Sequence, residues 1–509
     1  MITSSLIFGK SASGKTVSIE GRMANRHGLI AGATGTGKTV TLRVLAESFS
    51  RLGVPVFMAD VKGDLSGIAR PGEANPRIEE RIQQLGITTH RPSGFPVVFW
   101  DLFGKSGHSI RTTVTEMGPL LIGRLLELSE AQSDALQLIF KIADDQQLLL
   151  IDLKDLQSVC LYLHEHQKEF SESLGGVSPS TLQTLQRKIV VLSEQGGKGF
   201  FGEPALEIRS LLRQDMNGQG LIHILDAREL IAQPRLYSTF MLWLLSELFE
   251  DLEEVGDLEV PKMVFFFDEA HLLFQEAPVA LVRQVEQVVR LIRSKGVGIY
   301  FVTQNPIDLP DTVLGQLGNR IQHALRAYTP KDQKAVKAAA ETFPINPALE
   351  TLNVITALQV GEALSSVLDL NGAPTPVERL WIVPPESRLR PLELEERKNQ
   401  ILRSPYGTQY DQEIDRESAY ERLKGRRLEE SKTPSEEEKK KKPASDGSAW
   451  ESFQEKPVAK RPAGREPDSL AESLGKSAVR SVGSAIGSAV GRQIVRGILG
   501  SILGGKGRF

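Results

Sequence analysis

The pattern G-x-x-x-x-G-K-T occurs twice near the start of this 509-residue chain, at residues 9–16 and 32–39. Where this pattern binds nucleotide phosphates, it leaves a buried strand and opens a helix. Backbone N–H groups and the positive helix end then surround the phosphates. The residues on either side of each copy therefore decide which copy can form a phosphate-binding loop.

The second copy has the required surroundings. The apolar residues 28–31 precede it and predict a buried strand, and Leu42, Leu45, Phe49 and Leu52 follow it with the spacing of one helix face. Gly53 then marks the end of that helix. We therefore expect a phosphate-binding loop made of Gly32, Ala33, Thr34, Gly35, Thr36, Gly37, Lys38 and Thr39.

The first copy lacks these surroundings. Residues 17–22 follow it, alternate in polarity as a strand does, and reach Gly21 before a helical turn could repeat. We interpret this copy as a chance match within a β-hairpin formed by residues 1–28.

The composition excludes several classes of protein. The one cysteine, Cys160, rules out an internal disulfide framework, and no cationic start leads into a long apolar stretch. These features predict a cytoplasmic protein without a secretory signal. The net charge of −3 does not mark the whole chain as a nucleic-acid binder, but it allows positive charge to gather in a ring or groove.

Strand and helix patterns alternate between residues 29 and 385, which predicts an α/β core whose largely parallel sheet is covered on both faces. Many more residues separate Lys38 from Asp268 than one crossover needs, so we expect a mostly helical insertion at about 110–215. Within it, residues 193–199 predict a mobile loop. The expected strands cover residues 29–31, 54–59, 95–100, 221–225, 263–267, 299–303 and 320–326.

The composition changes after residue 385. We expect a charged helical extension at 386–430, a disordered linker at 431–467 and a basic, Gly-rich amphipathic segment at 468–509. In that last segment Gly483, Gly487 and Gly491 would let helices approach closely, and arginines interrupt any apolar span before it could cross a membrane. The segment could mediate self-association, contact a membrane surface or a protein partner, or remain a free tail. A location at the membrane periphery follows from the second alternative.

Two carboxylates follow the most apolar strand candidate, at the end where ligands collect on parallel sheets. Asp268 would bind Mg²⁺ together with the Thr39 hydroxyl, while Glu269 would orient or deprotonate the attacking water. Lys38 would reach the β- and γ-phosphates of ATP. The expected ligands are therefore ATP and Mg²⁺.

Two further residues are candidates for the catalytic machinery. Gln304 follows the strand at 299–303 and would sense the γ-phosphate or the water; the alternative is that it caps a loop. Arg293 lies on a helix at 281–295 and would reach a neighbouring subunit's nucleotide as an arginine finger; the alternative is a solvated helix face. His271 would either couple nucleotide state to a partner or make a local hydrogen bond.

Four motifs in order resemble the HerA/FtsK superfamily of P-loop ATPases, in its bacterial HerA-like, YjgR-type branch: residues 25–39, Asp60-Val61-Lys62-Gly63-Asp64, residues 268–271 and residues 303–306. The resemblance covers about residues 1–385 and implies a RecA-like fold, commonly assembled as a hexameric ring that moves on double-stranded DNA. It also makes Arg26 and Asp60 candidates for the nucleotide site or for contacts between subunits. Archaeal HerA proteins carry a small β-barrel before the loop, whereas this chain has room there for one hairpin.

Two functions follow from these observations. The first is a Mg²⁺-dependent ATP hydrolase that works as an oligomeric motor on DNA, a helicase or translocase. The alternative is an ATP-dependent conformational switch or a membrane-associated scaffold that does not move DNA.

Overall fold

The structure is a computed structural model that describes residues 4–170, 175, 177–274 and 279–432. The chain divides into two compact units, Met1–Ala419 and Tyr420–Phe509. Nearly all of the expected linker at 431–467 and the whole Gly-rich segment at 468–509 lie outside the described residues. The described part of the second unit belongs to helix α14 (Ala419–Lys432).

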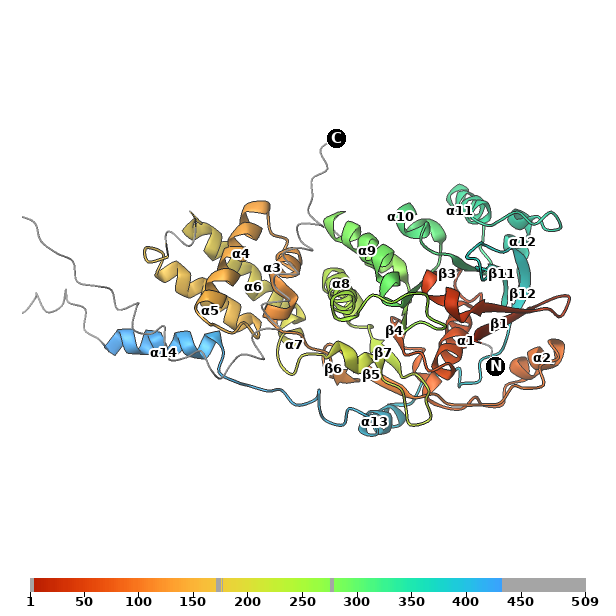
Figure 1. The fold of residues 1–509 in the computed structure, drawn as a ribbon, viewed down its shortest axis with the longest axis horizontal. Helices are drawn as coiled ribbons and strands as arrows, with labels where there is room; N and C mark the ends of the chain where they lie inside the picture. The colour runs from red at the N-terminus through yellow and green to blue at the C-terminus, as the bar shows by residue number, and fades with distance from the viewer. Residues whose placement is uncertain (1–3, 171–174, 176, 275–278, 433–509) are drawn as a thin grey trace, which may run out of the picture. The chain divides into compact units, whose positions relative to one another are not determined.

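Within the described part of the chain, twelve strands form one sheet in the order β2-β1-β12-β11-β10-β3-β9-β8-β4-β7-β5-β6 (Figure 1). The strands from β10 to β6 in this order are parallel, and those from β2 to β10 are antiparallel. The predicted α/β, RecA-like fold with a mostly parallel sheet is therefore confirmed. The strands are β1 (Ser5–Ser11), β2 (Thr16–Glu20), β3 (Gly28–Ala31), β4 (Val56–Asp60), β5 (Val97–Asp101), β6 (His108–Ser109), β7 (Ile222–Asp226), β8 (Met263–Phe267), β9 (Val297–Thr303), β10 (Asn319–Gln322), β11 (Glu362–Ser366) and β12 (Glu378–Ile382).

Strand β8 is buried on both faces, as a central parallel strand must be. Phe266 points to the face covered by α1 (Lys38–Arg51), where its ring lies 6.2 Å from that of Phe49. Its neighbours point to the other face, and there the Phe267 ring stacks 5.5 Å from that of Phe301. Helices α8 (Pro234–Asp251) and α9 (Val279–Ile292) cover that second face (Figure 1). The aromatic side chains of one strand thus anchor both helical layers.

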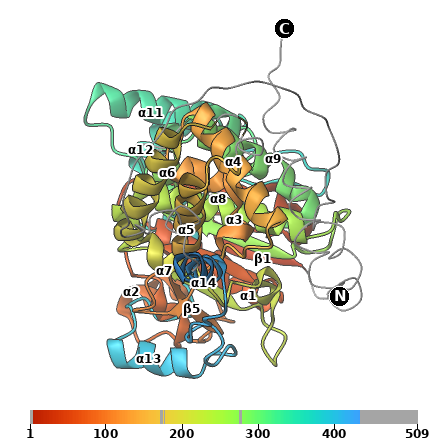
Figure 2. The same ribbon diagram turned by 90° about the vertical axis from the view of Figure 1, so that its left-hand side faces the viewer.

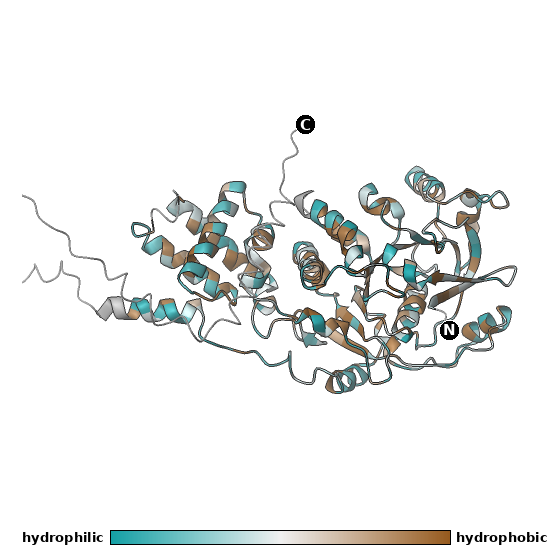
Figure 3. Cartoon of the chain, in the orientation of Figure 1, coloured by the Kyte–Doolittle hydropathy of each residue, from teal (hydrophilic) through white to brown (hydrophobic). Residues whose placement is uncertain are grey.

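The remaining helices lie around this core, between and after its strands in the sequence. Figure 3 shows polar and apolar residues sharing the same helices, as expected of helices with one face on a core. No described helix combines the length and apolar composition that crossing a bilayer requires. These helices are α2 (Pro76–Gln84), α3 (Val114–Leu125), α4 (Glu130–Asp145), α5 (Leu153–Glu165), α6 (Pro179–Leu192), α7 (Lys198–Phe200), α10 (Asp311–Leu314), α11 (Pro330–Glu341), α12 (Thr351–Ala357) and α13 (Leu394–Leu402).

Helices α3 to α7 lie between β6 and β7, and α4, α5 and α6 pack against one another (Figure 2). The expectation of a mobile loop at 193–199 is wrong. Residues Ser193–Gly197 form a π-helical turn, and α7 follows it directly. Gln195 and Gly196 depart from helical φ/ψ within this stretch, and the buried Phe200 of α7 packs 5.6 Å from Phe240 and 5.8 Å from Trp243 on α8.

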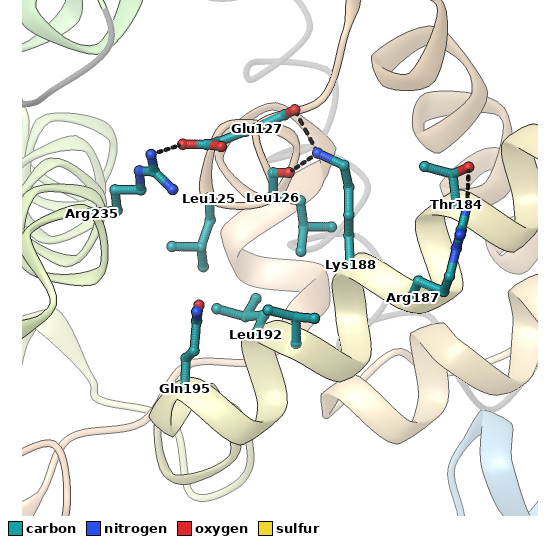
Figure 4. A pocket seen from close by; sticks show the side chains of 10 residues that line it. Leu125, Leu126, Glu127, Thr184, Arg187, Lys188, Leu192, Gln195 and Arg235 are labelled. Carbon is teal, nitrogen blue, oxygen red and sulfur yellow. Dashed lines mark hydrogen bonds and ion pairs between the residues drawn. The ribbon is translucent and has the colours of Figure 1, made fainter.

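A pocket of about 410 Å³ lies among these helices (Figure 4). The charged side chains that line it already have hydrogen-bond or ion-pair partners within the chain. Lys188 donates to the carbonyl oxygens of Leu126 and Glu127, at 2.7 and 2.8 Å, and Arg235 forms an ion pair with the Glu127 carboxylate. These contacts join α6 and α8 to the end of α3, so we assign the pocket's polar groups a structural role.

The first G-x-x-x-x-G-K-T copy lies across the β1–β2 hairpin rather than between a strand and a helix. Gly9 is within β1, where a Cβ would come within 2.5 Å of the Leu380 side chain on β12. Lys15 forms an exposed ion pair with Glu378 at 2.5 Å. Close strand packing, not phosphate binding, therefore explains the glycine, and the lysine is paired across the sheet.

The chain after residue 385 continues within the first unit. Arg388 and Arg397 are buried, and so are Tyr406 and Tyr410. Both tyrosine rings lie 5.3 Å from the buried Trp100 of β5, and Asp411 is 2.8 Å from His108 Nδ1. Residues 386–419, part of the charged helical extension expected at 386–430, thus contribute buried side chains to the first unit.

Candidate nucleotide-binding site

The second G-x-x-x-x-G-K-T copy connects β3 to α1. Gly35 and Gly37 have φ of 77° and 120°, values that L-residues rarely adopt. A Cβ on Gly32 would lie 2.6 Å from the His323 side chain, whereas one on Gly35 would meet nothing within 4 Å. The loop is therefore packed against the protein at its start and open at its tip, as a cradle for phosphate requires.

Lys38 is the first residue of α1 and is 6% exposed. Its ammonium donates to the carbonyl oxygens of Gly32 and Ala33, at 2.6 and 3.1 Å. Burial lowers the Lys38 pKa, although the charge of Glu269 opposes this effect. Thr39, the second residue of the helix, is half-buried. Both side chains lie at the positive end of α1, where anions are favoured.

His323, which follows β10, packs against the start of the phosphate-binding loop. Its Nε2 is 2.8 Å from Thr41 Oγ1 on α1, and its Nδ1 is 2.9 Å from the Glu362 carbonyl oxygen. Burial lowers the pKa of His323 to about 4, so the ring is neutral near pH 7. We did not single it out from the sequence, because nothing there shows that β10 lies next to β3.

The strand order places the acidic residues beside this loop. Strand β9 lies between β3 and β8, with Ala31 opposite Thr303 and Phe267 opposite Phe301. The residues that follow these three parallel strands therefore meet at one edge, which we call the carboxyl edge of the sheet. Lys38, Asp268, Glu269 and Gln304 all lie on it.

Glu269 lies close to three other side chains of this site. Its backbone adopts the left-handed conformation (φ 47°), which is uncommon outside glycine and clusters at functional sites. Lys62 Nζ lies 2.6 Å from Oε1, Gln304 Nε2 lies 3.3 Å from both oxygens, and His271 Nδ1 lies 3.4 Å from Oε2. Burial alone would raise the Glu269 pKa, but the Lys62 and Gln304 hydrogen bonds outweigh it and lower the pKa.

Asp268 is buried, and among the described residues no cation lies within ion-pair distance of it. Burial raises its pKa to about 7, with the Lys62 charge opposing this and the Glu269 charge adding to it. A buried carboxylate that lacks a paired cation, at the same sheet edge as the start of α1 where Thr39 lies, offers an oxygen donor of the kind that Mg²⁺ prefers. The residues present therefore fit a magnesium nucleotide.

Asp60 ends β4 and lies next to this site, but the structure shows it engaged elsewhere. Its carboxylate accepts the Gly63 N–H at 2.7 Å and the Leu65 N–H at 3.1 Å. Burial raises its pKa to about 6, and the charge of Asp64 adds to the effect. Asp60 therefore shapes the loop that carries Lys62, a lysine to which we assigned no role from the sequence.

The structure does not bring Arg26 or Arg293 to the phosphate loop of their own chain. Arg26 precedes β3 and Arg293 precedes β9, so both lie at the opposite, amino edge of the parallel strands. Arg26 Nη2 is 3.4 Å from Asp257, which precedes β8. Burial and the Arg26 charge lower the Arg293 pKa, which indicates that the two arginines are close.

Comparisons with known proteins found both a family and individual similar proteins. The family model described as helicase HerA-like C-terminal matches residues 6–508. Probable helicase MJ1565 of Methanocaldococcus jannaschii is 23% identical over 352 residues, 67% of this chain and 60% of that relative. The match thus spans less than two thirds of the relative's length.

Two solved structures are also similar. VirB4 of Thermoanaerobacter pseudethanolicus is 17% identical with a TM-score of 0.49, and the match covers 74% of this chain and 96% of that one. The bacterial conjugative coupling protein TrwB is 15% identical with a TM-score of 0.48, and the match covers 74% of this chain and 89% of that one.

Proposed function

Because the chain belongs to the HerA-like helicase family and is a P-loop ATPase of that kind, we propose that it hydrolyses ATP with Mg²⁺ and works as an oligomeric motor on DNA. One observation carries the proposal. Three neighbouring parallel strands end, at one edge, in a phosphate-binding loop, an Asp-Glu pair and a glutamine that contacts the Glu. A merely nucleotide-binding site would not need the second carboxylate.

Each residue has a chemical role in this proposal. Lys38 and the loop N–H groups would bind the β- and γ-phosphates, while Asp268 and Thr39 would hold Mg²⁺. The bound Mg²⁺ would neutralise charge on the phosphate oxygens. Glu269 would orient a water and accept its proton as the water oxygen bonds to the γ-phosphorus and the bond to the departing ADP breaks. Gln304, already 3.3 Å from Glu269, would keep that carboxylate in position.

The arginines of the amino edge support an oligomer. A head-to-tail ring joins two different surfaces of each subunit. We propose that the interface pairs the amino edge of one subunit with the carboxyl edge of the next, so that Arg293 reaches the neighbour's γ-phosphate and Arg26 lies close by. A ring, with six subunits as the commonest form in the family, and double-stranded DNA as its substrate are parts of this proposal. So is a cytoplasmic location, with any membrane contact made by residues 468–509.

The test is the ATPase rate of the full chain with no polymer, double-stranded DNA, single-stranded DNA or RNA, paired with a mass measurement in ATP. The Lys38→Ala variant is the control, since it should abolish both turnover and nucleotide binding. We expect an oligomer whose turnover double-stranded DNA raises severalfold. A monomer that no polymer stimulates would remove the motor and leave the ATPase.

A further inference from the structure

Among the described residues, Lys62 is the cation closest to the proposed catalytic carboxylate. Its Nζ lies 2.6 Å from Glu269 Oε1, and the Glu269 side chain is only 6% exposed. Strand β4 runs beside β8 with Ala59 opposite Phe267, so the turn after β4 faces the residues after β8. The ion pair is therefore a consequence of strand register, and it occupies one oxygen of the carboxylate that the water would need.

The turn that carries Lys62 is rigidly built. Asp60 accepts hydrogen bonds from the N–H groups of Gly63 and Leu65, and the buried Arg43 donates to the Asp64 carbonyl oxygen. Gly63 has φ of 78°, and a Cβ there would lie 2.8 Å from Arg228. The backbone is thus held from several sides, and the flexible part is the lysine side chain itself, which is 38% exposed.

The position of Lys62 also brings it close to the phosphate-binding lysine. Its charge opposes protonation of Lys38 and favours ionisation of Asp268, so it lies near both groups. Two lysines thus lie beside one phosphate loop, and the charges of Glu269 and Asp268 act on both of them. A terminal phosphate, with three oxygens and nearly two negative charges, is a better partner for a lysine than one carboxylate oxygen.

We propose that Lys62 is a second phosphate-site lysine, which exchanges Glu269 for the terminal phosphate of a nucleoside triphosphate. The exchange would free the Glu269 carboxylate to bind water only when a γ-phosphate is present. A diphosphate has no such group and leaves the Lys62–Glu269 ion pair in place. This inference rests on the proposed ATPase function and adds to it the means by which the site distinguishes triphosphate from diphosphate.

The experiment compares Lys62→Met and Lys62→Arg in the full chain by calorimetry, with Mg²⁺ and either ADP or a non-hydrolysable ATP analogue. Losing one charge-assisted hydrogen bond to phosphate should weaken Lys62→Met binding of the analogue about tenfold and change ADP binding less than about twofold. Lys62→Arg keeps the charge and should restore most of the preference. Turnover of Lys62→Met should fall by at least the same factor.

Lys105→Met is the matched control, because Lys105 forms a 2.6 Å ion pair with Glu229, both are exposed, and Lys105 follows β5, which is two strands away from β4 in the sheet. It should alter neither affinity. An equal loss of both nucleotides in Lys62→Met, with a lower melting temperature, would assign Lys62 a structural role and overturn the inference, as would an unchanged preference. A wild-type chain that binds neither nucleotide would instead overturn the proposed ATPase itself.

Discussion

The two edges of the parallel sheet differ in how completely they are built. At the carboxyl edge, Lys38, Glu269 and Gln304 are buried or held by hydrogen bonds from neighbouring strands. At the amino edge, Arg293 is exposed, and Arg26 has one ion pair of 3.4 Å with the exposed Asp257. One edge is preorganised within the chain, and the other presents cations outward.

This difference in preorganisation fits the role that we propose for each edge. Groups that must stabilise charge in a fixed geometry are held by the surrounding fold, because reorganising them during the reaction would cost free energy. An arginine that serves another subunit needs only to be exposed at the interface. The predictions below test whether the two edges belong to one composite site.

The largest effect is expected at the carboxyl edge. Glu269→Gln removes the proton acceptor but keeps the shape of the side chain, so turnover should fall about 10³- to 10⁴-fold. Binding of ATP should persist, as measured by calorimetry. Glu229→Gln, on an exposed residue that also follows a strand of this edge, is the control. Normal turnover in Glu269→Gln would refute the assignment of the water-positioning role.

Arg293→Ala should reduce turnover about 10³-fold, the lower end of the range for an arginine finger. The nearby Arg290→Ala, on the exposed side of α9, which ends just before Arg293, should not. Mixing Arg293→Ala with Glu269→Gln gives the sharper test. Interfaces that combine the intact Glu269 of one subunit with the intact Arg293 of the other should regain activity that neither variant has alone. If the mixed oligomers regain no activity, the two edges do not form one composite site.

Asp268→Asn should stabilise the nucleotide-free, Mg²⁺-free protein. The Asp268 pKa is about 7 in the folded state, above its usual value near 4, so ionisation lowers the free energy of unfolding as pH rises from about 4 to 7. The variant should therefore gain about 1–3 kcal/mol at pH 8 and nothing at pH 4. Denaturant unfolding at the two pH values measures it.

Asp226 ends β7, two strands away from β8, and Asp226→Asn should change stability in the opposite direction to Asp268→Asn. Although burial opposes ionisation, hydrogen bonds from Arg228 and Ser106 lower the Asp226 pKa to about 2. Its stabilisation is present above pH 4 and is lost as pH falls toward 2, so this variant should be less stable than the wild type at pH 8. The same sign for both variants would contradict the contrast between the two carboxylates.

The smallest effect is expected for Arg26→Ala. Its partner Asp257 is exposed, so the ion pair contributes less than about 1 kcal/mol to stability. Nucleotide affinity of the isolated subunit should also stay within about twofold, because Arg26 lies at the edge away from the phosphate loop. A large loss of affinity would place Arg26 in the nucleotide site of its own chain.

Much of the fold could be predicted from local patterns. The apolar runs at 28–31 and 263–267 became β3 and β8 because parallel strands are buried on both faces and need continuous apolar sequence. The helical turns at 193–200 could not be predicted, since the glycines there favour a loop and the contact of Phe200 with α8 joins residues distant in the sequence. Strands β11 and β12, which lie within the region 29–385, were missed; no helix separates them, and they pair antiparallel.

By itself the sequence determined which residues we propose for the phosphate and water chemistry, because a phosphate loop and a carboxylate pair depend on short contiguous spacing. Only the tertiary structure decided that Lys62 contacts Glu269, that His323 supports the loop, and that Arg26 and Arg293 lie at the other edge. These relations depend on strand order and register. Hydrogen bonds between strands distant in the sequence set them, and no local pattern encodes them.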